Sequence, residues 1–282
     1  MRRKLIKRGQ IETACLLAPA LVVLALVFVV PLARLFSLAF TDPAGPFATF
    51  ETLAGSPVYR TIAVNTLLMA FAVTFICALL AWPVSYVLSR LKGRLFGLAL
   101  YGVLFPFWIS VLVRTFAWML ILERNGPVNR FLMALHLTDH PLALLFNNTG
   151  VLIGMVHVLM PYIILPLYSA MVRVDRRLLL ASDGLGASLL DTFRRVYFPL
   201  CLPGLAGGAT FVFLLSLGFF ITPSLLGGSN AINLSMLIAS FVNDRLAWSL
   251  AAAASMVLLA AVLLIIAAAA KLLPLDRGFL AR

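Results

Sequence analysis

The residue types that most often carry out chemistry are few in this chain of 282 residues, and their spacing is unfavourable. His136 and His140 stand four positions apart, a spacing that could bind zinc on a helix, but Asp139 between them is typical of a loop. The three cysteines form no CxxC pair, and the sequence has no Gly-Lys pair that could belong to a phosphate-binding P-loop. The sequence therefore predicts no metal site, no cofactor bound by this chain and no enzymatic activity of its own.

The ten acidic residues argue against another kind of chemistry, the coupling of transport to protons or sodium ions. All ten lie in loops or at the ends of apolar segments, whereas ion-coupled carriers usually have carboxylates within the membrane. A stand-alone ion-coupled carrier or channel is therefore the more distant alternative. The energy for transport is expected to come from a partner protein.

The composition points to a membrane environment. Hydrophobic residues make up 63% of the chain and charged residues 11%, and the mean hydropathy is +1.07. A soluble domain has roughly 45–50% apolar and about 25% charged residues. These values exclude a soluble enzyme, a disordered regulator and a coiled coil.

Six apolar stretches are long enough to cross a bilayer, whose hydrocarbon core of about 30 Å takes roughly 20 helical residues. They cover residues 13–40, 61–89, 95–122, 150–172, 200–221 and 247–273. Sixteen Lys and Arg residues flank one side of these spans, and four flank the other. Because positive charge accumulates on the cytoplasmic side, both termini are predicted to be cytoplasmic. The net charge of +12 then reflects topology, and no nucleic-acid partner is expected.

The longest cytoplasmic connection, residues 173–199, begins with a predicted short helix. Its first part, residues 175–183, is compatible with a helix and carries a short apolar run. Gly184 and Gly186 follow and permit a sharp turn of the backbone. The pattern predicts that the chain reverses direction here, close to the membrane.

A second short helix is predicted in the same connection. Ser188 followed by Asp191 fits a capping box, which marks a helix start. This helix is expected to end before Pro199, because proline interrupts the helical ladder. Two short helices joined by a glycine turn would form a compact knob, and residues 173–199 are called the knob below.

The knob resembles the cytoplasmic signature of the membrane permeases of bacterial ABC importers. That signature reads Glu-Ala-Ala, three residues, Gly, nine residues, Ile, one residue and Leu-Pro. Ala181, Gly186 and Pro199 match it, whereas Leu180 replaces the Glu and Ser182 replaces the second Ala. The resemblance assigns the ATPase-coupling loop to Leu180, Ala181, Ser182, Asp183, Gly186, Ala187, Val196 and Pro199.

The resemblance implies an all-α polytopic membrane protein of the bacterial inner membrane, with six transmembrane helices and the type I ABC importer permease fold. Residues 1–60 would hold the N-terminus, the first span and an external loop, 61–273 the five-span core, and 274–282 a cytoplasmic tail. In that family the knob inserts into an ATPase subunit, which binds ATP and Mg²⁺. The implied partners are a second permease subunit, two cytoplasmic ATPase subunits and an external or periplasmic substrate-binding protein.

The resemblance also narrows the expected substrate. Residues 105–118, 150–171 and 221–228 are similar to the first of the two paired permeases of spermidine/putrescine importers. The same branch includes importers of opines, aminoethylphosphonate and ferric iron. Polyamines are therefore the favoured substrate, and the other three remain alternatives.

Polar and aromatic side chains within the spans are candidates for the pathway or its gate: Trp108, Arg114, Trp118, His157 and Tyr162. Arg114 is costly near the bilayer interior unless it faces protein or water. It could line the pathway, or it could make an internal hydrogen bond, and a cationic substrate favours the hydrogen bond. The other four could contact substrate, but they could equally pack, join helices or anchor the protein at the interface. Four prolines are expected to interrupt the spans and free carbonyls, namely Pro83, Pro106, Pro161 and Pro166.

Overall fold

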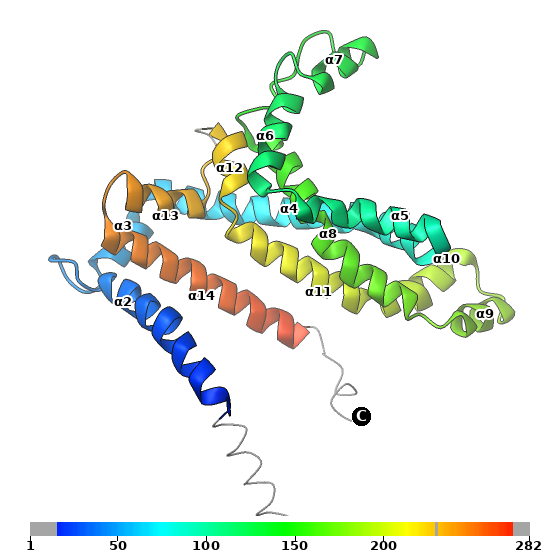
Figure 1. The fold of residues 1–282 in the computed structure, drawn as a ribbon, viewed down its shortest axis with the longest axis horizontal. Coiled ribbons are helices and arrows are strands. Elements are labelled where there is room, and N and C mark those ends of the chain that lie inside the picture. The colour runs from blue at the N-terminus through cyan, green and yellow to red at the C-terminus, as the bar shows by residue number, and fades with distance from the viewer. Residues whose placement is uncertain (1–15, 229–230, 273–282) are drawn as a thin grey trace, which may run out of the picture. The chain divides into compact units, whose positions relative to one another are not determined.

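The computed structural model describes residues 16–228 and 231–272, and every regular element within these ranges is a helix (Figure 1). The described elements are η1 (Ala25–Val29), α2 (Val30–Leu38), α3 (Ala48–Gly55), α4 (Pro57–Arg90), α5 (Gly93–Leu104), η2 (Phe105–Trp108), α6 (Val111–Leu122), α7 (Pro127–Ala134), α8 (Asn148–Val172), α9 (Arg176–Gly184), α10 (Leu189–Thr192), η3 (Phe193–Tyr197), α11 (Phe198–Leu217), α12 (Ile221–Leu226), α13 (Leu234–Asn243) and α14 (Trp248–Leu272). The predicted all-α class is confirmed.

Within the described residues, five helical segments are long and apolar enough to cross a membrane. They are Leu16–Leu38, Pro57–Arg90, Asn148–Val172, Leu189–Leu217 and Trp248–Lys271. A sixth span results if the bent pair Gly93–Trp108 and Val111–Ala134 is counted as one. Each of the six predicted spans therefore has a helical counterpart, although the fifth begins at Leu189 and not near residue 200.

The third predicted span, 95–122, is not one straight helix, and this corrects the sequence prediction. The helical segments before and after Ile109 and Ser110 are bent by 101° relative to each other. Pro106 supplies no backbone N–H to the ladder, and Ile109 and Ser110 adopt extended ψ angles of 130° and 137°. α6 therefore leaves the direction of α5 and packs against α12 and α8.

The other three prolines expected to interrupt the spans lie inside continuous helices. α4 passes through Pro83, and α8 passes through Pro161 and Pro166. Neighbouring helices can hold such a helix together although each proline removes one ladder bond. Of the four, only Pro106 adjoins a break in its helix.

The chain divides into two compact units, and the larger one, made of the described parts of Val58–Leu237 and Leu258–Arg282, has α8 at its centre. In α8, 61% of the apolar stretch is buried within the chain, more than in any other described span. α11 packs along α8 through small residues. A Cβ at Gly204 would lie 2.5 Å from that of Ala170, and one at Gly208 would lie 2.9 Å from Cγ1 of Ile163. Glycines four residues apart thus allow the two backbones to approach closely.

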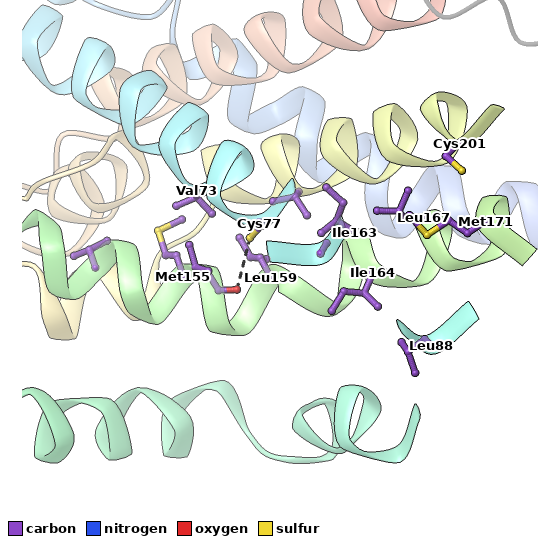
Figure 2. Packing of buried hydrophobic residues seen from close by; sticks show 14 of the residues in the cluster. Val73, Cys77, Leu88, Met155, Leu159, Ile163, Ile164, Leu167, Met171 and Cys201 are labelled. Atoms are coloured by element: carbon purple, nitrogen blue, oxygen red, sulfur yellow. Dashed lines mark hydrogen bonds between the residues drawn. The ribbon is translucent and has the colours of Figure 1, made fainter. Parts of the chain in front are cut away.

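α4 packs on α8 as well, in the core shown in Figure 2. Cys77 is fully buried, and its Sγ donates to the carbonyl of Val156 over 3.6 Å, drawn as a dashed line in Figure 2. Ser85 Oγ donates to the carbonyl of Ile164 over 3.1 Å. Both contacts attach polar atoms of α4 to carbonyls of α8, and so fix the register of the two helices.

The smaller unit consists of the described parts of Met1–Pro57 and Ile238–Val257. Its core is made of Ala39, Ala252 and Ala253, against which Leu35 and Phe50 pack. The hydroxyl of Thr49 donates to the carbonyl of Ala39 over 2.6 Å and ties α3 to the end of α2. The candidate sites lie in the larger unit.

Candidate functional site

The first arm of the knob is α9, Arg176–Gly184, which forms where the sequence predicts a short helix, and both of its ends are capped. Asp175 caps the start, where its Oδ1 accepts from the N–H of Arg177 over 2.9 Å. At the other end the N–H of Gly186 donates to Asp183 O over 2.9 Å, and the N–H of Ala187 donates to Ser182 O over 3.2 Å. These two bonds form a Schellman motif, which requires a left-handed residue.

Gly186 supplies that left-handed residue, with a φ of +79°. The glycine of the importer signature therefore ends α9 and turns the chain, because glycine adopts the left-handed conformation without steric cost. Gly184, the other predicted turn glycine, is the last residue of α9. Only Gly186 carries the turn.

The second arm of the knob starts as predicted but continues further. Ser188 Oγ accepts from the N–H of Asp191 over 3.1 Å, so Ser188 caps the helix start as predicted. The reciprocal bond of a capping box, from the backbone N–H of Ser188, is replaced by one from its hydroxyl to Asp191 Oδ2 over 2.6 Å. The prediction that this helix ends before Pro199 is wrong: α10 passes through the π turn η3 into α11. In η3 the N–H of Phe198 donates to Phe193 O, a wider step that accommodates the proline without breaking the helix.

The two arms are joined by a hydrogen bond that the sequence did not reveal. Ser182 Oγ and Thr192 Oγ1 lie 2.8 Å apart. Ser182 stands where the importer signature has its second Ala, so this departure adds a bond across the knob. The eight predicted coupling residues all lie in the two arms and the turn between them.

Large apolar side chains of the knob project into solvent. Leu185 and Leu189 are each 88% exposed, and Leu180 is 69% exposed. These leucines flank the turn or lie on the outer side of α9. Such an exposed apolar patch at the end of a helix pair is typical of a surface that another protein covers.

An aromatic cluster links the second arm to α4, and it is called the aromatic joint below: Trp82, Tyr86, Phe193, Tyr197 and Phe198. The ring centroid of Trp82 lies 5.3 Å from that of Phe198 and 5.7 Å from that of Phe193, and those of Tyr86 and Tyr197 are 6.1 Å apart. Sequence reasoning missed this contact. The spacing of four between Trp82 and Tyr86, and again between Phe193 and Tyr197, is the signal that could have indicated it.

Beside the joint, a groove of about 790 Å³ separates the knob from the ends of α4 and α8. Its wall combines apolar side chains with Arg90, Arg176 and Asp183. Arg90 is oriented by a 3.0 Å hydrogen bond to the hydroxyl of Tyr86. The aromatic joint thus holds the knob against α4, and a groove remains open beside it.

A second group of predicted residues meets where α6 crosses α8 and α12. Trp118 Nε1 donates to Nδ1 of His157 over 3.1 Å. The hydroxyls of Thr115 and Thr222 lie 3.1 Å apart and are buried. The threonine pair was missed from sequence, because it joins two helices that are 107 positions apart.

Four of the five predicted pathway residues form a polar cluster at this crossing: Arg114, Trp118, His157 and Tyr162. Arg114 is within electrostatic reach of both His157 and Tyr162. The Tyr162 ring packs edge-on against Phe107 and Phe211. Trp108 is apart from the cluster, since it is 71% exposed and stacks on Tyr101.

The internal hydrogen bond considered for Arg114 is not formed within the described part of the chain. Its Nε is buried and has no partner there. A charged side chain with a buried, unpaired donor is expensive in a membrane segment. Among the residues of the polar cluster, Arg114 is thus the one whose environment is incomplete.

Residues 92–273 match the family described as Binding-protein-dependent transport system inner membrane component. The chain is 34% identical to the spermidine/putrescine transport system permease protein PotB of Escherichia coli K12 over 190 residues, which cover 67% of this chain and 69% of that protein. It is 30% identical over 225 residues, 78% of each chain, to PhnU of Salmonella typhimurium, which is named for a 2-aminoethylphosphonate transport system. The fold is similar to that of a chain in a bacterial alginate ABC transporter, with a TM-score of 0.78, 18% identity and 95% of each chain covered.

Proposed function

Because the chain belongs to the family of binding-protein-dependent transport system inner membrane components, we propose that it forms half of a translocation pathway powered by separate ATPase subunits. Its partners are a second permease subunit, two cytoplasmic ATPase subunits and an external substrate-binding protein. ATP and Mg²⁺ are bound by the ATPase, and this chain binds no cofactor. Both termini lie in the cytoplasm, as the distribution of Lys and Arg indicates.

The observation that carries this proposal is the exposed leucine surface of the knob. Leu185 and Leu189 are each 88% exposed. The backbone beside them is held by the hydrogen bonds of the turn and of the Ser188 cap. Fully burying a leucine contributes roughly 1.5–3 kcal/mol. The knob thus offers a preformed apolar contact to a groove in the ATPase.

Movement of the knob would reach the spans through two rigid connections. The second arm is continuous with α11, and α11 is close-packed on α8 at Gly204 and Gly208. The aromatic joint holds the same arm against α4. When ATP closes the ATPase subunits, the knob moves with them and the spans open toward the loaded binding protein.

Release of the ATPase from the assembled transporter tests the docking surface. The double variant Leu185→Ser/Leu189→Ser is expected to lower ATPase recovery on a tagged permease by about tenfold or more, because two leucine side chains no longer bury apolar surface in the ATPase. Leu135→Ser is the matched control, since Leu135 is 52% exposed and lies between the third and fourth predicted spans, on the side of the membrane opposite to the knob. Full recovery of the ATPase with the double variant would contradict the proposed docking.

Polyamines are the proposed substrate class. Support comes from the relatives named for spermidine/putrescine transport, which are 34–35% identical to this chain. 2-Aminoethylphosphonate is the second candidate, supported by the relative named for it, and opines and ferric iron are further alternatives. Aromatic faces such as those of Trp118 and Tyr162 can attract a passing cation without carboxylates.

A thermal-shift screen of the cognate binding protein separates these candidates. Spermidine or putrescine is expected to raise its melting temperature. Stabilisation by aminoethylphosphonate, an opine or ferric iron, with none by either polyamine, would overturn the substrate proposal. That result would leave the proposal that the chain is a permease subunit unchanged.

A further inference from the structure

Arg114 has no counter-charge within the described part of this chain. Its buried Nε has no hydrogen-bond partner among residues 16–228 and 231–272, and no acidic residue there forms an ion pair with it. Glu123, the nearest acidic residue in the sequence, lies nine positions further on and is exposed. Guanidinium groups stay charged in proteins, so the compensating acceptor must come from outside the described residues.

The two faces of α6 indicate where that acceptor lies. One face is held by its neighbours: Thr115 of α6 hydrogen-bonds to α12, and Trp118 of α6 hydrogen-bonds to α8. Another face is apolar and open, with side chains that are 47–68% exposed: Leu112, Val113, Phe116 and Leu120. At 100° per residue, Arg114 lies about 40° from Trp118, at the edge of the held face, and about 60° from Ala117, an exposed residue that continues the open face beyond Val113. A protein that covers the open face can therefore reach the guanidinium.

We infer that Arg114 binds a carboxylate of a second permease chain that covers this open face of α6. The inference rests on the proposed function, because it requires two permeases side by side. The Nε of Arg114 is buried, so water does not supply its acceptor, and a transported substrate is present only transiently. The proposed polyamine substrate is itself cationic and cannot supply the acceptor. A carboxylate fits best, since its two oxygens match the planar fork of donors on arginine.

The second permease is, by the same reasoning, a different chain. A second copy of this chain would bring the same ten carboxylates, and all of them lie in loops or at the ends of the spans. A carboxylate within a span of the partner satisfies Arg114 and also places an acid in the shared pathway. The pathway would then have an acidic side that this chain does not provide.

Assembly of the two permeases is the first readout. When a tagged form of this chain is co-expressed with the second permease and the ATPase, Arg114→Met is expected to lower recovery of the second permease by about tenfold or more, because one charge of a buried pair is left alone. Arg114→Lys, which keeps the charge but not the fork, is expected to fall in between. Arg34→Met is the matched control: Arg34 is an exposed arginine in an apolar helix and can reach the interface. It is expected to assemble normally.

Charge-matched rescue is the second readout, and it separates a specific pair from a general folding defect. Each acidic residue in the spans of the second permease is changed to its amide in the Arg114→Met background. One of these changes is expected to restore assembly to within about threefold of the original complex, since it removes the lone charge. Normal assembly of Arg114→Met, or a defect that none of the partner's amide variants rescues, would overturn the inference.

Two further outcomes would also overturn it. Rescue by Glu123→Gln in this chain would mean that the partner is a second copy. Normal assembly of Arg114→Met together with loss of uptake would assign Arg114 to the substrate. Uptake by the unmodified complex is measured in parallel: if it needs no ATP, the proposed function fails, while the assembly data still decide whether Arg114 has a partner carboxylate.

Discussion

Substitutions at Gly186 are expected to uncouple the knob while leaving the spans intact. A Cβ built on Gly186 meets no heavy atom within 4 Å, so a substitution acts through the backbone alone. Alanine at a φ of +79° costs roughly 1–2 kcal/mol. Proline is worse, because its φ is fixed near about −65° and it lacks the N–H that donates to Asp183. Removing the two hydrogen bonds of the turn adds roughly 0.5–1.5 kcal/mol each.

These free-energy costs predict how far each substitution reduces the coupling of ATP hydrolysis to transport. A change of about 1.4 kcal/mol shifts an equilibrium tenfold, so Gly186→Ala is expected to shift the equilibrium between the folded and the unfolded turn by about 5- to 30-fold. Gly186→Pro is expected to abolish the turn. The assay is substrate-stimulated ATP hydrolysis by the assembled transporter in nanodiscs, with the amount of permease in the membrane measured alongside. Membrane insertion should be unchanged in both variants, because the spans do not depend on the turn.

Gly184→Ala is the matched control for this series. Gly184 also has open space around a Cβ, but it is a helical residue of α9 without a positive φ. Alanine there is expected to be neutral or to stabilise α9 by up to about 1 kcal/mol. Normal substrate-stimulated hydrolysis in Gly186→Pro would refute the coupling assignment, and equal damage by Gly184→Ala and Gly186→Ala would refute the role of the left-handed turn.

Three other variants test the connections between the knob and the spans. Gly204→Ala is expected to destabilise the α8–α11 contact by roughly 1–3 kcal/mol in thermal unfolding, whereas Gly207→Ala, which has open space for a Cβ, should have little effect; equal melting temperatures would contradict the close packing. Trp82→Ala is expected to lower substrate-stimulated ATP hydrolysis more than the basal rate, because it removes the aromatic joint; an equal decrease in both rates would mean that the joint is not a coupling element. Ser182→Ala is expected to cost roughly 0.5–1.5 kcal/mol, and adding Thr192→Val should cost little more, since the two hydroxyls share one bond; fully additive effects in the double-mutant cycle would rule that bond out.

Features set by neighbouring residues could be predicted from the sequence. The helix start at Ser188 and the turn at Gly186 depend on a few adjacent positions, and both formed where they were expected. The apolar stretches predicted the spans because a bilayer imposes a minimum length on them. Local chemistry and segment length were thus sufficient for most of the helices and for the knob.

Features that depend on distant partners could not be predicted in this way. The helix expected to end before Pro199 continues, because a π turn accommodates the proline, and Trp82 of α4 packs against the preceding Phe198. The sequence indicated an interruption at Pro106, but the direction that α6 takes after Ile109 and Ser110, and its packing against α12, were seen only in the structure. The polar cluster likewise needed the structure, since Trp118 and His157 belong to different helices.

Uptake by reconstituted vesicles tests the central claim most directly. Vesicles that contain this chain, the second permease and the ATPase are supplied with labelled spermidine and the cognate binding protein. Uptake is predicted to require ATP on the side of the membrane where the ATPase lies, the binding protein and both permeases, and this chain alone is predicted to transport nothing. Uptake by this chain alone, driven by an ion gradient without ATP, would contradict the account and indicate an ion-coupled carrier.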